Sequence, residues 1–438
     1  MSVGEVSLLL LICFVIAIAI GFIKGLNTGI LGMSFAIVIG IATGVKFPQI
    51  RSQFPVNVFI TLFAVSAFFG YFVDNGTVGW LAKIIIYRFR GVPKILPFLF
   101  FATGMLMGAL GGPSMVAFVC ALSFPVGHAS GMKPAQVASV SLLGTQVGAF
   151  TPFSQYGSVA RGLIDAIDKG RYVDQGSEII WKIFGTQFIC YMVIMLVYYI
   201  YFKNYKLQKI EGIEKPGPLD AIQRKSLWII GCAFALIVLV PLIARQIGNP
   251  GFSRLAAYCD VVPVCLFGCT VNSLLKLGNE TEVIKKRVPW NTMTMIFGMG
   301  MMVGLANLLG VLDYLTGIVG KVPPAYLSPV FVFSAAFISL FSSSLSVVMP
   351  SLLPIAGMLA VSTGVNPIML FASICIASVT TAQSPLSAGG GQIVGACTEE
   401  ICDSRTIFNS LFATALACLV MLVILSFLGA FNIFHIAN

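Results

Sequence analysis

The stretch TPFSQYGS, residues 151–158, interrupts a segment that would otherwise cross a membrane as one helix. AQVASVSLLGTQVGAF precedes it and VARGLIDAI follows it, and both are compatible with an apolar helix. Its proline and glycine disfavour a continuous helix, and its polar side chains are costly at bilayer depth. Because backbone polar groups cannot stay unpaired in lipid, we expect this stretch to face protein or a water-filled cavity.

The composition of the chain is that of a polytopic membrane protein. Hydrophobic residues make up 58% of the 438 residues, charged residues only 10%, and the mean hydropathy is +0.97. The net charge of +10 comes from basic residues in short loops between apolar runs. This pattern is typical of topology signals rather than of a nucleic-acid-binding face, so the expected surroundings are the lipid bilayer and no nucleic acid.

A spanning helix needs roughly 20 apolar residues. Continuous spans are predicted near residues 6–22, 29–46, 54–73, 180–202, 227–245, 255–275, 290–308 and 407–432.

Four further segments are interrupted. Shorter apolar pairs predict two re-entrant hairpins, at 95–127 with its tip at LGGPS and at 325–361 with its tip at FSSSLS. Two helices are predicted to break inside the membrane, 134–168 at TPFSQYGS and 366–401 at SPLSAGGG. Irregular backbone at this depth is the usual sign of a transporter site.

These features recur at a nearly constant offset along the chain. GMKPAQV (131–137) aligns with GVNPIML (364–370), and TPFSQYG aligns with SPLSAGG at the same separation, so the sequence predicts a duplication. The predicted repeats are 1–202 and 227–438, joined by a basic cytoplasmic linker at 203–226.

Five crossings per repeat, an odd number, make the second repeat inverted. With the linker in the cytoplasm, the cytoplasmic loops carry more than twice as many Lys and Arg residues as the external loops. The predicted fold is therefore all-α and polytopic, with two inverted repeats that each hold a hairpin and a broken helix. The predicted location is the cell (inner) membrane, with both termini external.

In such an arrangement the breaks and hairpin tips can converge near the midplane. Helix N-termini there favour an anion, whereas unwound carbonyls and hydroxyls can coordinate a cation. Hydroxyls and amides bind carboxylate oxygens without a buried charge, and glycines allow close backbone approach. The predicted substrate-binding residues are Ser114, Ser154, Gln155, Tyr156, Gly157, Ser344, Ser346, Gln383, Ser387, Gly389 and Gly390. The predicted cation-binding residues are Gly112, Pro113, Thr151, Ser343 and Ser384.

Small residues can also serve only to let membrane helices pack closely. For isolated serines such as Ser139 and Ser373 we favour that interpretation, whereas symmetric clusters at breaks favour binding. Arg161 lies one to two turns beyond the first break and could bind a substrate carboxylate, extend toward the membrane interface, or pair with Asp165 at the external surface. Asp260 is expected to be structural rather than a proton relay.

Three stretches of the first half carry a family resemblance. They resemble the bacterial malonate/dicarboxylate carriers of the ion-transporter superfamily, which includes the divalent-anion/sodium symporters. The three stretches are FPVNVFITLFAVSAFFGYFVDNGTVGWL, LGGPSMVAFVCALSFPVG and TPFSQYGS. Two stretches look like their counterparts in the second half, VPWNTMTMIFGMGMMVGLANLLG and SSSLSVVMPSLLPIAG. In the divalent-anion symporters both tips carry Ser-Asn-Thr; the asparagines are missing here, and only Ser114 and Ser344 can be carried over.

The resemblance implies a secondary carrier for a small dicarboxylate such as malonate, succinate or malate, driven by sodium or protons. It also implies a homodimer in which the hairpins and broken helices move as an elevator against a static scaffold. No cofactor is expected beyond the coupling ion, and no metal beyond sodium.

Other cargoes are compatible with the same architecture. The alternative cargoes are citrate, another organic anion and arsenite, and a further alternative is sodium/proton exchange. An exchanger would need acidic ligands at the midplane, where this chain has almost none. An enzyme is not expected because HExxH, GxSxG and clustered His or Asp are absent from the sequence, and an ATP-driven pump would need GxxxxGK[ST], which is also absent.

Overall fold

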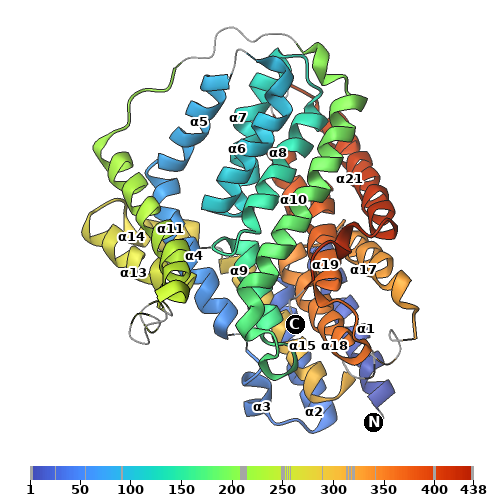
Figure 1. The fold of residues 1–438 in the computed structure, drawn as a ribbon. Helices are drawn as coiled ribbons and strands as arrows, with labels where there is room; N and C mark the ends of the chain where they lie inside the picture. Colours follow the sequence, from blue (N-terminus) through green and yellow to red (C-terminus); the bar gives the residue numbers. More distant parts are fainter. Residues whose placement is uncertain are drawn as a thin grey trace.

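The computed structural model describes residues 3–24, 26–54, 56–89, 92–207, 215–247, 258–288, 290–311, 321–340, 342–397 and 401–435, with the single positions 252, 254, 256, 314 and 317. Every regular element in this part of the chain is helical, with no strand (Figure 1). The predicted all-α polytopic fold is confirmed.

The helices of the first half run in chain order as α1 (Val3–Lys24), α2 (Thr28–Thr43), α3 (Phe47–Arg51), α4 (Val56–Asp74), α5 (Thr77–Phe89), α6 (Leu96–Gly111), α7 (Val116–Ala129), α8 (Pro134–Ala149), α9 (Gln155–Asp165) and α10 (Gly176–Tyr201). Those of the second half are α11 (Ala221–Ile247), α13 (Val261–Leu274), α14 (Glu280–Arg287), α15 (Trp290–Leu308), α17 (Pro324–Ser339), α18 (Met349–Thr363), α19 (Pro367–Thr381), α20 (Ala388–Ala396) and α21 (Ser404–Phe427).

Four helical stretches among the described residues are long and apolar enough to cross a membrane: Pro93–Gly111, Val173–Tyr201, Ser344–Thr363 and Arg405–Phe427. The first and third belong to hairpin arms, and the sequence predicted that residues 95–110, within the first, would be too short to cross comfortably. Apolar length therefore does not separate a hairpin arm from a crossing helix in this chain. The turn residues at the arm's end make that distinction.

Each hairpin turns at a local signal. Tip 1 (residues 112–115) joins α6 to α7, and Gly112 has φ 72° and ψ −170°, a conformation essentially restricted to glycine. Tip 2 (residues 342–348) joins α17 to α18, where the Ser343 hydroxyl accepts a hydrogen bond from the Ser346 N–H and the next turn is a π-helix, Ser344–Val348. Both predicted hairpins are present as helix–turn–helix elements.

Two helices stop inside the protein and resume after a short irregular segment. Break 1 (residues 150–154) separates α8 from α9, and break 2 (residues 382–387) separates α19 from α20. Of the predicted segments, residues 208–214 of the linker, residue 341 of the second hairpin and residues 398–400 of the second broken helix lie outside the described residues.

The contacts between helices are reciprocal between the two halves. Within each half the first hairpin arm packs on the broken helix, α6 on α8 and α17 on α19. Across the halves, contacts come in matched pairs: α4–α13 with α15–α2, α7–α20 with α18–α9, and α10–α19 with α21–α8. In Figure 1, α6 and α7 occupy the upper part of the molecule and α17 and α18 the lower part. This pattern fits a duplicated, inverted unit, and the repeat boundaries stay a prediction.

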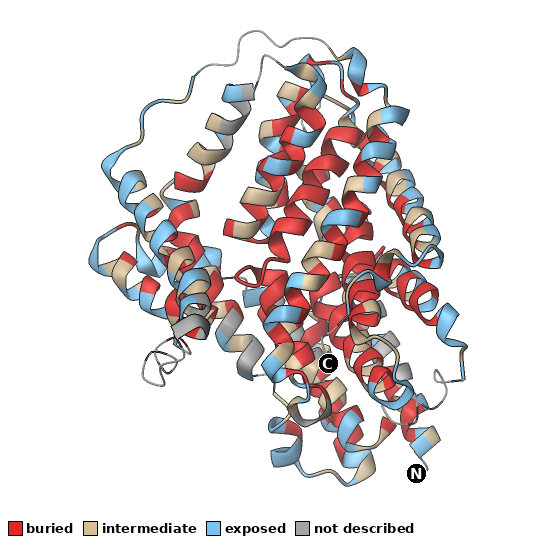
Figure 2. Cartoon of the chain, in the orientation of Figure 1, coloured by how far each residue is buried: buried red, intermediate tan, exposed pale blue. Residues whose placement is uncertain are grey.

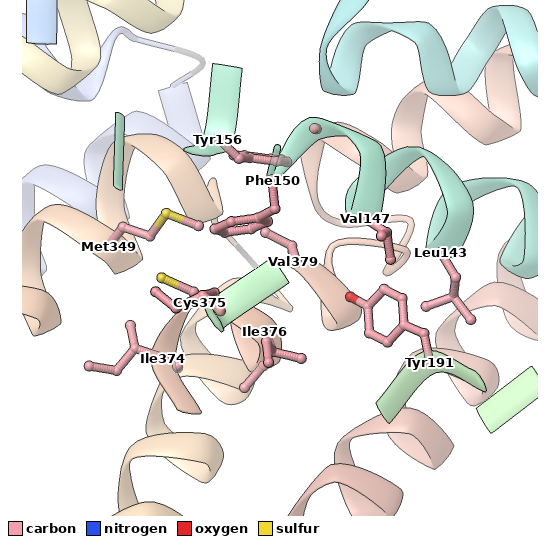
Figure 3. Packing of buried hydrophobic residues seen from close by; sticks show 14 of the residues in the cluster. Leu143, Val147, Phe150, Tyr156, Tyr191, Met349, Ile374, Cys375, Ile376 and Val379 are labelled. Carbon is pink, nitrogen blue, oxygen red and sulfur yellow. The ribbon is translucent and has the colours of Figure 1, made fainter. Parts of the chain in front are cut away.

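The two broken helices form the centre of the molecule. Every residue of α8 from position 136 to 149 is buried, as is almost all of α19, whereas the outer helices α10 and α21 expose one face (Figure 2). Rings and aliphatic side chains fill the space between α8, α10 and α19, and Tyr191 of α10 lies beside Leu143 and Val147 of α8 (Figure 3). The breaks are thus enclosed by protein, where irregular backbone is tolerated.

The first hairpin packs on α8 through glycines. A Cβ atom added to Gly148 of α8 would lie 1.9 Å from the Met105 carbonyl oxygen of α6, and one added to Gly108 of α6 would lie 2.0 Å from the Thr145 carbonyl oxygen. Both helices carry the GxxxG spacing that lets membrane helices approach closely. The backbones of α6 and α8 are therefore in direct contact next to tip 1 and break 1.

The second hairpin packs on α19 through hydroxyl groups instead. The hydrogen bonds between α17 and α19 are Ser328–Ser373 (2.7 Å), Ser339 to the Ser378 carbonyl (2.6 Å) and Thr381 to the Ala336 carbonyl (2.9 Å). Ser373 therefore has the packing role that the sequence favoured for it.

Candidate functional site

A cavity of about 320 Å³ lies where the irregular segments of both halves meet. Tip 1, break 1, tip 2 and the first turn of α20 all contribute to its wall, as do residues of α4 and α14. Of the residues predicted from the sequence, those that line it are Gly112, Pro113, Ser114, Ser154, Gln155, Tyr156, Ser343 and Gly389.

Break 1 is held against the first hairpin. The Ser154 hydroxyl donates a 2.8 Å hydrogen bond to the Gly108 carbonyl oxygen, which also accepts the Gly112 N–H at 2.9 Å. A Cβ on Gly112 would lie 2.7 Å from Gln155 Oε1, so a side chain there would displace this amide from tip 1. Ser154 therefore positions the wall of the cavity and keeps oxygen lone pairs for a ligand.

Helix α9 starts at the cavity without a side-chain cap. Ser154 is its N-cap residue, but the Ser154 hydroxyl is directed to α6 rather than to the first N–H groups of α9. The first turn of a helix has N–H groups with no partner within the helix and a partial positive charge. Gln155 and Tyr156, which begin α9, both line the cavity, so the cavity wall includes a feature that favours an anion.

Tyr156 is fixed by aromatic stacking. Its ring lies on that of Phe150 with centroids 5.4 Å apart and an interplanar angle of 22° (Figure 3). Phe150 is the first residue of break 1 and is fully buried. The two rings join the end of α8 to the start of α9 across the break.

Several predicted residues lie outside the cavity lining and make hydrogen bonds or close contacts within the protein. Thr151 donates to the Gly148 carbonyl oxygen at 2.8 Å, and a Cβ on Gly157 would lie 2.2 Å from the Thr151 carbonyl oxygen. Gln383 is fully buried and accepts a 2.8 Å hydrogen bond from Ser139. Ser139, assigned to packing from the sequence, thus joins α8 to break 2.

The serines of break 2 and tip 2 mostly shape the backbone. The Ser387 hydroxyl accepts from the Gly390 N–H and so caps α20, while it donates to the Ala382 and Ser384 carbonyl oxygens. The Ser344 hydroxyl donates to the Ser378 carbonyl oxygen at 2.9 Å, and Ser346 contacts the Ser343 hydroxyl at 3.0 Å. Of these, only Ser343 reaches the cavity. Substrate or cation binding by the others stays a prediction.

Five polar residues of the cavity were missed from the sequence, and one of them is Ser66 of α4. Gln146 lies in α8 four residues before break 1, and Gln392 lies in the first turns of α20; one buried amide oxygen of each accepts no hydrogen bond from the described residues. Glutamine close to a break in an otherwise apolar segment was the available signal. Lys286 and Arg287 at the end of α14 also line the cavity, although their sequence suggested only a basic loop.

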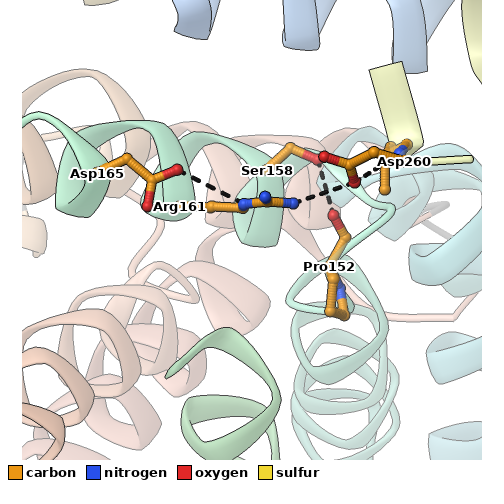
Figure 4. A network of polar contacts seen from close by, with 6 residues as sticks. Pro152, Ser158, Arg161, Asp165 and Asp260 are labelled. Carbon is orange, nitrogen blue, oxygen red and sulfur yellow. Dashed lines mark hydrogen bonds and ion pairs between the residues drawn. The ribbon is translucent and has the colours of Figure 1, made fainter. Parts of the chain in front are cut away.

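Arg161 lies in a second cavity of about 360 Å³, apart from the first. Its guanidinium lies between two carboxylates of the protein, with Nε 3.5 Å from Asp165 Oδ2 and Nη1 3.1 Å from Asp260 Oδ1 (Figure 4). Asp260 also caps α13 by accepting the Val261 N–H at 2.7 Å, which agrees with a structural role. The pairing with Asp165 expected as one alternative is present, and a role of Arg161 toward substrate stays a prediction.

Residues 4–149 match the family model described as the N-terminus of the dicarboxylate carrier protein MatC. The resemblance to the dicarboxylate carriers is confirmed over this first third of the chain. The match includes α6, tip 1, α7 and α8, and ends one residue before break 1.

The fold as a whole is similar to a solved structure, that of the YdaH transporter of Alcanivorax borkumensis, which is described as having an unusual topology. The TM-score is 0.59 at 12% sequence identity, and the similarity covers 89% of this chain and 88% of that one. At this identity the likeness shows a shared fold. No curated protein sequence matches the chain significantly.

Proposed function

We propose that the protein is a secondary active transporter that moves a small dicarboxylate, such as malonate, succinate or malate, together with sodium or protons. The observation that carries the proposal is the cavity in which tip 1, break 1, tip 2 and α20 converge. The match of residues 4–149 to the dicarboxylate carriers and the fold shared with a transporter support it.

The first substrate carboxylate binds at the start of α9. The uncapped N–H groups there and the Gln155 amide are neutral donors, which hydrogen-bond a carboxylate without a permanent charge in the bilayer. The Ser114 hydroxyl, which donates to the Gly111 carbonyl oxygen at 3.2 Å, turns to the carboxylate when the substrate binds. The free amide oxygen of Gln146 and the Ser154 oxygen are acceptors that suit a cation or a protonated substrate oxygen.

Coupling follows from the charge of the site. A dianion alone would pay a large desolvation cost on crossing the apolar scaffold, and the cation reduces that cost when both are bound. The hairpins and broken helices move together as an elevator, because α6 and α17 pack directly on α8 and α19. Two copies of the chain form the proposed homodimer, as in the family that it resembles.

The test is uptake of labelled malonate, succinate and malate into proteoliposomes under an imposed sodium or proton gradient. Gln155→Leu removes a cavity amide and is expected to abolish uptake. Gln136→Leu is the matched control, because Gln136 is also buried but bonds Asn204 at 2.7 Å away from the cavity. It is expected to lower stability and leave the KM unchanged. Absence of uptake of every dicarboxylate by the wild type under both gradients would refute the proposed cargo.

A further inference from the structure

Two cations face the neutral groups of the cavity. Lys286 and Arg287 are the only charged residues among its described lining residues. They belong neither to the tips nor to the breaks but to the last turn of α14, a short helix between α13 and α15. The charge of the cavity is therefore supplied by an element separate from the hairpins.

Close packing brings α14 to the cavity. Its fully buried Val283 packs against α4, and a Cβ on Gly70 of α4 would lie 2.7 Å from the Arg287 Cβ. Arg287 Nη2 lies 3.0 Å from Asp74 Oδ1, which fixes the guanidinium at the end of α4. Gly70 is thus the position that lets the stem of Arg287 lie along the cavity wall.

Lys286 is less constrained. Its side chain is 67% exposed, and its Nζ lies 2.5 Å from Glu282 Oε2 one turn earlier in α14. The Glu282 carboxylate raises the pKa of the Lys286 ammonium above its usual value. Because neither Glu282 nor Asp74 lines the cavity, only the positive member of each pair does so.

We propose that Lys286 and Arg287 form a cationic mouth that draws in a dianionic substrate and holds its second carboxylate, the one remote from α9. This inference rests on the proposed function and names how the substrate is selected. The neutral donors of tip 1 and break 1 satisfy one carboxylate, and the cationic mouth satisfies the other across the same cavity. A monocarboxylate gains only the first set of contacts and is bound more weakly.

The electrostatic consequence is measurable. Positive charge at the entrance of a cleft raises the local concentration and the association rate of an anion, and salt screens this effect at exposed groups. The apparent KM for a dicarboxylate therefore rises with ionic strength in the wild type. Removal of a mouth charge raises the KM at low salt and flattens its dependence on salt.

The chain contains a matched control on the same helix. Basic residues in a last helical turn also offset the helix dipole, and Lys285, Lys286 and Arg287 all do so in α14. Lys285 is exposed like Lys286 but does not line the cavity. Lys285→Gln thus removes the same charge from the same turn without changing the cationic mouth.

The experiment measures the KM of the dicarboxylate that the wild type transports, in proteoliposomes of the full-length protein at low and high salt. Lys286→Gln is expected to raise the KM about threefold to tenfold at low salt, as an exposed steering charge does, with little effect at high salt. Lys285→Gln is expected to leave the KM unchanged. Thermal stability in detergent checks that both variants are folded.

Arg287 requires a paired substitution, because its ion pair with Asp74 is less exposed to solvent than the pair of Lys286 with Glu282. Arg287→Gln alone leaves the Asp74 carboxylate without its partner, so the double variant Arg287→Gln/Asp74→Asn removes both charges together. It is expected to raise the KM for the dicarboxylate with little effect on uptake of a monocarboxylate.

Failure of the cationic mouth and failure of the proposed function give different results. Equal KM values for Lys286→Gln and Lys285→Gln in a transporter that takes up dicarboxylates would overturn the cationic mouth and leave the proposed function standing. Wild-type protein that transports no dicarboxylate would overturn both.

Discussion

Substitution of Gly148 by alanine tests whether the contact of α6 with α8 holds the site in shape. Gly148 is one residue before the end of α8, and its added Cβ would lie 1.9 Å from the Met105 carbonyl oxygen and 2.7 Å from the Ala109 nitrogen. Such an atom is essentially never found closer than 3.0 Å to a neighbour, so the helices must separate by about 1 Å. Neither neighbour is the flexible end of a side chain.

Two opposing contributions set the expected change in the free energy of unfolding. Overpacking of this kind destabilises by about 1–3 kcal/mol, and the higher helix propensity of alanine returns about 0.5–1 kcal/mol. The displacement also reaches tip 1 and break 1, because α6 ends at Gly111 and the Ser154 hydroxyl bonds the Gly108 carbonyl oxygen. We therefore expect Gly148→Ala to lose most of its uptake while it remains folded with a lower thermal midpoint.

The assay combines thermal unfolding in detergent with uptake into proteoliposomes. Gly231→Ala is the control, because Gly231 lies in α11 with no atom within 4 Å of its added Cβ. It is expected to be neutral or stabilised by about 0.4–1 kcal/mol. If Gly148→Ala unfolds and transports like Gly231→Ala, the close α6–α8 contact has no role in shaping the site.

Three further substitutions are expected to separate backbone shape from side-chain contact. Gly112→Ala forces a residue with a side chain into a conformation that costs about 1–3 kcal/mol and pushes it against Gln155, so uptake should be lost in a protein that still elutes as one species in size-exclusion chromatography. Ser387→Ala removes the cap of α20 and should cost about 1 kcal/mol in thermal unfolding, without the direct effect on substrate affinity expected of a cavity residue. Asp260→Asn weakens the link from Arg161 of α9 to α13, and because the pair is partly exposed it should change stability by less than about 1 kcal/mol; a larger loss would mean that the pair is effectively desolvated.

Local sequence signals were sufficient to predict the hairpins and the broken helices. Pro113 after two glycines, and Pro152 two residues before Ser154, disfavour a continuous helix through the conformation and hydrogen-bonding capacity of the residues themselves. Proline alone is not sufficient, because Pro125, Pro329 and Pro354 lie inside helices. The two hairpins and two breaks were therefore predictable, as was the all-α fold from the length of the apolar runs. The approach of α6 to α8 was also encoded, in the GxxxG spacings around Gly108 and Gly148, and was missed.

Only the tertiary structure decided which polar groups face the cavity. Ser154 and Ser387 occupy equivalent places at the two breaks, yet Ser154 bonds the neighbouring α6 and lines the cavity, whereas Ser387 turns inward and caps its own helix. The direction of a hydroxyl depends on which acceptor another helix offers, and that acceptor is distant in sequence. The position of Lys286 and Arg287 at the cavity was likewise not predictable from the sequence, because it depends on the packing of a whole helix. Their charge is evident in the sequence, but only the packing of α14 on Gly70 of α4 places that charge at the cavity.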